Sequence, residues 1–159
     1  MGITVRRMQP DDAPAVYTLF DRVLAIIPYY NDLAKAAERT KYRAEQLVAD
    51  CAADPDAVLV AELDGAIVGY CISRMDDDLV WLSWFGADPD VRHRGVGSAL
   101  LRELAVSAVR RGAHKVWCDT RTDNTRSQSV LVKADYVRVC ELTNHWFGQD
   151  FYLWEKTLG

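Results

Sequence analysis

The residues 92–97, Arg-His-Arg-Gly-Val-Gly, combine three basic side chains with two glycines. An apolar run from Leu79 to Phe85 precedes them, and apolar residues follow at the three- and four-residue spacing of a helix. The glycines therefore fall where a helix begins, and the first N–H groups of a helix have no partner inside it. Those groups lie at the positive end of the helix dipole, and glycine lets a ligand approach them closely. The segment predicts a site for a pyrophosphate.

The spacing excludes two familiar phosphate-binding loops. A Walker loop needs Gly-x4-Gly-Lys-Ser/Thr and a dinucleotide fingerprint needs Gly-x-Gly-x-x-Gly, and neither pattern is present. The pattern that is present is Arg-x-x-Gly-x-Gly, from Arg92 to Gly97, three residues after Pro89. It resembles the acyl-CoA pyrophosphate motif of the GNAT superfamily of acyl-CoA-dependent N-acyltransferases.

This resemblance implies an enzyme that moves an acetyl group from acetyl-CoA to an amine by direct transfer. Many family members carry Asn-x-x-Ala-x-x-x-Tyr downstream, and Asn124 and Ser127 stand at its first and fourth positions, followed by Lys133. The backbone of residues 85–87 would bind pantetheine and the thioester oxygen. The residues that the resemblance assigns to coenzyme binding are Phe85, Gly86, Ala87, Arg92, His93, Arg94, Gly95, Val96, Gly97, Ser98, Asn124, Ser127 and Lys133.

One departure from the family pattern concerns the leaving thiolate. Leu131 stands where many members carry a tyrosine that is often assigned as the general acid. Leucine has no proton to give, so the thiolate leaves unassisted, or water or another side chain supplies the proton. Ser127 and Ser129 are the nearest hydroxyls in sequence. A protein of the same fold that binds CoA as a sensor or interaction module, without turnover, is the alternative.

Asp119 is the candidate general base. An alkyl amine is mostly protonated at neutral pH, so a group must accept a proton before the amine attacks the thioester. Asp119 precedes Asn124 by five residues, close to where some protein N-terminal acetyltransferases of the family carry a catalytic glutamate. Trp117 and Cys118 predict an apolar setting that would raise the carboxylate pKa. A structural aspartate bonded to Thr120 or to a helix terminus is the competing interpretation.

Aromatic residues of two loops could line the pocket for the acceptor, a small-molecule or peptide amine. The resemblance places Tyr29, Tyr30, His145 and Trp146 near that pocket, although loop tryptophans also commonly cover the core. Tryptophans at 81, 84 and 117 are predicted to belong to the strand core.

The elements that position these residues alternate between strand and helix patterns. The predicted order is β-α-α-β-β-β-α-β-α-β-β, with the second helix running from about Asn31 to Cys51, a hairpin turn at Asp64-Gly65 and a helix stop at Arg111-Gly112. That order is the GNAT order. It implies an α/β (α+β) fold in which four helices flank a mixed, mostly antiparallel seven-stranded sheet. The resemblance also implies that the strands before Arg92 and around Trp117 splay apart to admit pantetheine.

Length and composition limit the function classes. The 159 residues predict one domain over residues 1–159. A net charge of −4 argues against nucleic-acid binding, and no apolar run is long enough for a membrane span. The start of the chain lacks the apolar core of a signal peptide, so we expect a cytoplasmic protein, with its four cysteines as core thiols and no metal site. Dimers are frequent in the family, which makes a homodimer a candidate. A plain α/β interaction domain without a nucleotide site is a further alternative.

Overall fold

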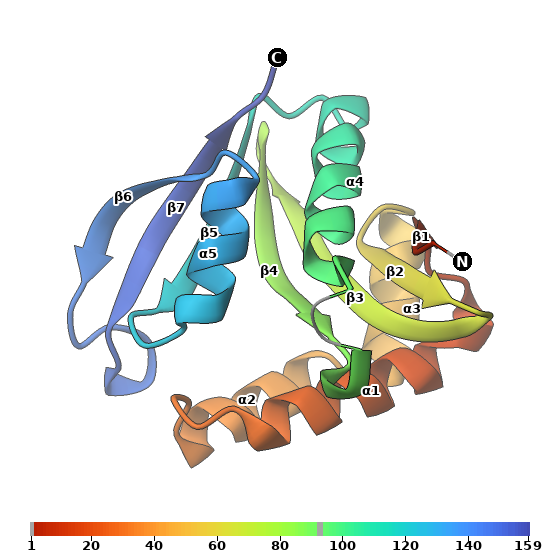
Figure 1. Cartoon of the computed structure of the whole chain (residues 1–159), viewed down its shortest axis with the longest axis horizontal. Coiled ribbons are helices and arrows are strands. Elements are labelled where there is room, and N and C mark those ends of the chain that lie inside the picture. Colours follow the sequence, from red (N-terminus) through yellow and green to blue (C-terminus); the bar gives the residue numbers. More distant parts are fainter. Residues whose placement is uncertain (1, 92–93) are drawn as a thin grey trace.

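The computed structural model describes residues 2–91 and 94–159, which form a curved sheet with helices on both faces (Figure 1). The strands are β1 (Thr4–Arg7), β2 (Val58–Leu63), β3 (Ala66–Asp76), β4 (Leu79–Ala87), β5 (Lys115–Arg121), β6 (Val137–Leu142) and β7 (Phe151–Thr157). The helices are α1 (Ala13–Ile26), α2 (Asp32–Lys41), α3 (Ala44–Ala53), α4 (Val96–Arg110) and α5 (Thr125–Lys133), with short 3₁₀ turns at Pro10–Asp12, Pro89–Val91 and Trp146–Gly148.

The sheet has the strand order β1-β2-β3-β4-β5-β7-β6. The pair β4 and β5 is parallel, and every other neighbouring pair is antiparallel. This arrangement confirms the predicted mixed, mostly antiparallel sheet. Its strands also follow the predicted order along the chain, and the hairpin between β2 and β3 turns at Asp64-Gly65 with both residues at positive φ.

Two hydrophobic clusters hold the helices on opposite faces of the sheet. Alternation along β2 sends Leu59 and Ala61 into the cluster that contains α4, and Val58 and Val60 into the cluster that contains α1. Figure 1 shows α4 and α5 on one face and α1, α2 and α3 on the other. A side chain on Gly69 of β3 would overlap Val96, so this glycine lets the first turn of α4 lie directly on the sheet.

The prediction of four helices is wrong, because the described residues form five. The helix expected from about Asn31 to Cys51 divides into α2 and α3 at Tyr42 and Arg43. The Tyr42 backbone leaves the helical region, with φ −117° and ψ 35°, and its buried ring packs edge-on against Phe20 of α1. Tertiary packing of one tyrosine therefore turns the chain where no glycine or proline marks a break.

Two expectations about buried residues also need correction. Trp81, Trp84 and Trp117 are half-buried, because their face of β4 and β5 borders open pockets, although Trp84 also packs against the cluster that contains α1. Cys71 and Cys118 are buried, but Cys140 is exposed, because β6 is the edge strand of the sheet. No helix among the described residues is both long enough and apolar enough to cross a membrane.

Candidate active site

The parallel strands β4 and β5 separate after three paired positions. Their register runs from Val80 opposite Val116 to Leu82 opposite Cys118 and stops there, although both strands continue. Figure 1 shows the two strands spreading apart beyond that point. From Trp84 to Ala87, β4 pairs only with β3, so one row of its backbone N–H and C=O groups faces the gap. The splay implied by the resemblance is therefore confirmed, and it leaves main-chain groups available to a ligand.

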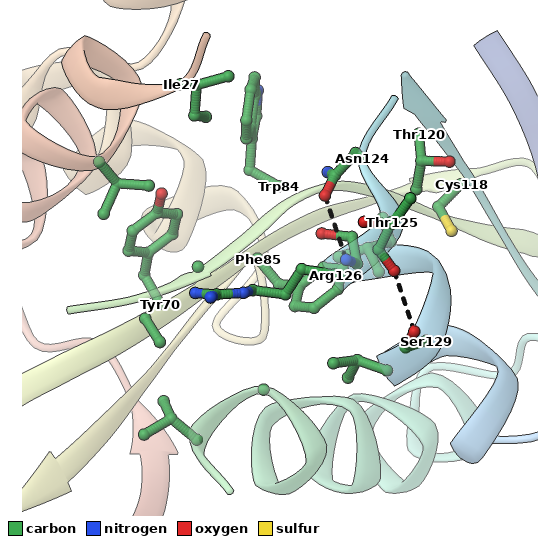
Figure 2. A pocket seen from close by; sticks show the side chains of 18 of the residues that line it. Ile27, Tyr70, Trp84, Phe85, Cys118, Thr120, Asn124, Thr125, Arg126 and Ser129 are labelled. Carbon is green, nitrogen blue, oxygen red and sulfur yellow. Dashed lines mark hydrogen bonds between the residues drawn. The ribbon is translucent and has the colours of Figure 1, made fainter. Parts of the chain in front are cut away.

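A cavity of about 920 Å³ occupies this gap, and we call it the main pocket (Figure 2). Its size lies in the upper range for small-molecule sites. It is lined by the divergent part of β4, the first turn of α4, the end of β5, the start of α5 and the connection between α1 and α2. Of the residues predicted from the sequence to form the site, the lining includes Phe85, Gly86, Ala87, Gly95, Val96, Gly97, Ser98, Asp119, Asn124, Ser127, Lys133, Tyr29 and Tyr30.

The amino-terminus of α4 opens into the main pocket. Gly95 caps the helix with φ +80°, a left-handed conformation that favours glycine, and open space surrounds the position of its missing side chain. Gly97 follows in the first turn, where an added Cβ would lie 3.4 Å from Val130 of α5. The unpaired N–H groups of this turn and the helix dipole together suit an anion.

The basic residues of the sequence motif do not line the main pocket as far as the structure describes them. Arg92 and His93 lie outside the described residues, and Arg94 is exposed without lining the main pocket. The positive charge in the pocket wall comes instead from residues of α5. Lys133 and Arg126 both line the pocket, and Figure 2 shows the Arg126 side chain extending across it from the start of the helix. The sequence motif did not point to Arg126, because this residue stands at an unspecified position of the Asn-x-x-Ala pattern.

Asn124 lines the main pocket and also caps the helix α5. Its side-chain oxygen accepts a hydrogen bond from the Ser127 N–H at 3.1 Å and so caps the amino-terminus of α5. The carboxamide NH₂ group remains available to a ligand. The cap holds the α5 end of the pocket, which includes Ser127, in a fixed position beside β5.

Asp119 lies on the face of β5 that meets the main pocket. Its carboxylate is half-buried, and burial is the largest influence on its charge state. Thr120, the partner in the competing structural interpretation, points to the opposite face and accepts a hydrogen bond from Trp154 Nε1 at 2.9 Å. Burial, and secondarily the negative charge of Glu38, raise the pKa of Asp119 to about 7. A carboxylate with such a pKa can accept a proton near neutral pH.

Glu38 and Lys41 of α2 set the electrostatic surroundings of Asp119. The Glu38 carboxylate accepts a hydrogen bond from Trp84 Nε1 at 3.1 Å, and its other oxygen lies 3.7 Å from Lys41 Nζ. Glu38 raises the Asp119 pKa and Lys41 lowers it. Neither residue stands out in the sequence, because both look like the solvated face of an amphipathic helix.

The four predicted acceptor residues divide between two pockets. Tyr29 and Tyr30 line the main pocket, and the Tyr30 ring packs against Trp84 with centroids 5.4 Å apart. His145 and Trp146 instead line a second pocket of about 450 Å³ on the same sheet face, together with Trp81 and other residues. Trp146 contacts Phe151, which contacts Tyr30, so a row of aromatic rings separates the two pockets.

Cys118 is the cysteine that lines the main pocket, and it is poorly suited to be a nucleophile. Burial and the neighbouring Asp119 charge raise the pKa of its thiol. Reactive cysteines have the opposite environment, which favours the thiolate. The described site therefore resembles one for direct transfer more than one for a covalent enzyme intermediate.

Comparisons with known proteins agree with this geometry. The sequence model of the acetyltransferase (GNAT) family matches residues 24–136. An acetyltransferase of Pectobacterium atrosepticum is 32% identical over 135 residues, covering 85% of this chain and 88% of the relative. Two solved structures have the same fold at 19% identity. One is YncA of Salmonella typhimurium with its cofactor acetyl-CoA. Its TM-score is 0.82, and the match covers 100% of this chain and 95% of the YncA chain. The PaiA N-acetyltransferase of Thermoplasma acidophilum in complex with coenzyme A has a TM-score of 0.81 and 99% coverage of both chains. The chain therefore belongs to the GNAT acetyltransferase family.

Proposed function

We propose that this acetyltransferase moves an acetyl group from acetyl-CoA to a primary amine in the cytoplasm, without a covalent enzyme intermediate. One observation carries the proposal. A single pocket brings together the amino-terminus of α4, an unpaired edge of β4 and a carboxylate whose pKa is raised to about 7. Solved structures of the same fold with acetyl-CoA or coenzyme A bound make the coenzyme the natural donor.

In this proposal the coenzyme supplies the thioester, and the chain binds and orients it. The N–H groups of Gly97 and Ser98 in the first turn of α4 hold the pyrophosphate, and Arg126 adds positive charge. The free edge of β4 from Ser83 to Ala87 aligns the pantetheine arm with backbone hydrogen bonds. Holding the thioester in one orientation lowers the entropic cost of the reaction.

Asp119 prepares the acceptor in this proposal. The acceptor reacts as the neutral amine. As its nitrogen bonds to the thioester carbon, the Asp119 carboxylate takes a proton from that nitrogen, and the carbon–sulfur bond then breaks to release the CoA thiolate. The proton passes from Asp119 to solvent, and the thiolate is protonated from solvent. Tyr30 and Trp84 form an aromatic wall beside Asp119 for the body of the acceptor.

Thiol release from acetyl-CoA, measured with a panel of small amines and peptides, tests the proposal. We expect turnover with at least one primary amine and a mass increase of one acetyl group on that amine. Mass spectrometry of the protein after incubation with acetyl-CoA should show no acetyl adduct on Cys118. Coenzyme binding without turnover of any amine would favour a sensor module instead, and an adduct on Cys118 would refute direct transfer.

A further inference from the structure

Tyr70 of β3 carries a buried hydroxyl that has no hydrogen-bond partner among the described residues. Four buried side-chain polar atoms of the described residues lack a hydrogen bond: Tyr70 Oη, Ser107 Oγ, Tyr136 Oη and Gln149 Nε2. Of these residues, Tyr70 lines the main pocket. Figure 2 shows its ring in the pocket wall, on the side away from Asn124 and Thr120. A buried unpaired hydroxyl destabilises a fold, so its position calls for a compensating contact when a ligand is bound.

The phenol ring is held firmly in place. Tyr70 lies in the third of seven strands, pairs with Val60 on one side and Gly86 on the other, and is fully buried. Phe20 of α1 packs edge-on against the ring, with centroids 5.7 Å apart. The hydroxyl position is therefore fixed by the sheet and by α1, as a preorganised hydrogen-bond donor requires.

The hydroxyl lies directly over Gly86. A Cβ placed on Gly86 would be 2.5 Å from Tyr70 Oη, so only the absence of a side chain at Gly86 allows the hydroxyl to lie there. Gly86 is in the middle of the β4 segment that has no partner on the β5 side. The proposed function places the thioester along this segment, which puts the Tyr70 hydroxyl beside the reacting group.

Leu131, at the position of the family tyrosine, and two hydroxyls that line the main pocket are less suited to the leaving sulfur. Leu131 is fully buried and has no hydroxyl. Ser129 is exposed, and its hydroxyl donates to the Thr125 carbonyl within α5 at 3.0 Å. Thr120 also lines the main pocket, but its hydroxyl already accepts a hydrogen bond from Trp154 Nε1.

We propose that the Tyr70 hydroxyl donates a hydrogen bond to the thioester sulfur and stabilises the thiolate as the carbon–sulfur bond breaks. This inference rests on the proposed function. Burial raises the pKa of Tyr70 above its ordinary value, so the phenol keeps its proton throughout and acts only as a hydrogen-bond donor. The amine proton still goes to Asp119, and the departing thiolate is still protonated from solvent, so every proton is accounted for.

The test is Tyr70→Phe, with Tyr136→Phe as the matched control. Tyr136 also has a buried, unpaired hydroxyl, but it packs in the cluster beneath α4 and α5 and does not line the main pocket. We expect Tyr70→Phe to lower kcat roughly 10- to 100-fold, the effect of losing one hydrogen bond to a developing charge, with the KM for acetyl-CoA unchanged. Tyr136→Phe should keep the wild-type kcat. Neither variant should have a lower Tm than the wild type without ligand, because each loses an unpaired buried hydroxyl.

Several results would overturn the inference. An unchanged kcat in Tyr70→Phe would remove the role in catalysis, and so would an equal loss in both variants, which would indicate a general effect of the core. A higher KM at unchanged kcat would make the hydroxyl a binding group rather than a stabiliser of the leaving sulfur. In all three cases the wild type still acetylates its amine, so the proposed function stands. A wild type that turns over no amine refutes the proposed function and this inference with it.

Discussion

Replacing Asp119 with asparagine should change activity and stability in opposite directions. Asparagine has nearly the shape of a protonated aspartate but neither accepts a proton nor carries a charge. If Asp119 is the general base, its loss should lower kcat/KM by roughly 10²- to 10⁴-fold, the usual contribution of such a group. Binding of acetyl-CoA should be unaffected, because the proposed function assigns the coenzyme to α4, α5 and the edge of β4.

The stability change follows from the pKa of Asp119. Folding raises that pKa from 3.8 to about 7, so the folded state holds a proton that the unfolded state has lost between these pH values. Stability from this group is therefore fully present below about pH 4 and is lost as the pH rises through 7. At about 1.4 kcal/mol per pKa unit, the ionised carboxylate costs at most about 4 kcal/mol at pH 8. Because solvent reaches the half-buried group, the measured value should be smaller.

Two assays measure these effects. Urea unfolding at pH 4 and pH 8 should show Asp119→Asn equal to the wild type at low pH and more stable at high pH. Thiol release from pH 5.5 to 9 should show wild-type kcat/KM rising through a midpoint near 7, with a further rise as the amine itself loses its proton. A variant that is no more stable at pH 8, or that keeps wild-type kcat/KM while binding acetyl-CoA, would refute the role of Asp119.

Three further substitutions probe the surroundings of the site. Glu38→Gln keeps a hydrogen-bond acceptor for Trp84 but removes a negative charge, so the Asp119 midpoint in the pH–rate profile should move to lower pH. Lys41→Met removes a positive charge and should move that midpoint to higher pH. Shifts of the same sign in both variants would contradict the electrostatic assignment. Gly95→Val should lower both the Tm and the affinity for acetyl-CoA, whereas asparagine tolerates positive φ, so Gly95→Asn should lower only the affinity. Full acetyl-CoA affinity of both variants in calorimetry would show that Gly95 does not contribute to coenzyme binding. Asn124→Ala should cost about 1 kcal/mol in urea unfolding through the lost helix cap, and Asn124→Asp should retain the cap; equal stability of all three proteins would show that the cap is unimportant.

Local sequence signals account for most of the fold. The order of strands and the Asp64-Gly65 hairpin both follow from residue types at short range, and the structure has both. The break between α2 and α3 could not be predicted, because it depends on Tyr42 packing against Phe20 of another helix. Patterns within one element do not contain such contacts.

The same distinction between local and long-range signals applies to the residues of the candidate site. Gly95 and Gly97, which the proposed function uses through their backbone, could be placed at the start of α4 from spacing alone. Glu38 and Tyr70 could not, because their roles come from neighbours distant in sequence: Glu38 bonds to Trp84, and Tyr70 lies over Gly86. His145 and Trp146 were expected beside the acceptor tyrosines but line the second pocket, since the loop that carries them turns toward Trp81.

The central claim is that the amino-terminus of α4 holds the pyrophosphate of acetyl-CoA in the main pocket. Calorimetric titration of the wild-type protein with coenzyme A and with pantetheine, which shares its thiol arm but lacks the phosphates, tests it most directly. The pyrophosphate and the phosphorylated adenosine, which pantetheine lacks, should make the Kd of coenzyme A at least roughly tenfold lower than that of pantetheine, a difference of about 1.4 kcal/mol or more. Equal affinity for the two compounds, or no heat with either, would contradict the claim.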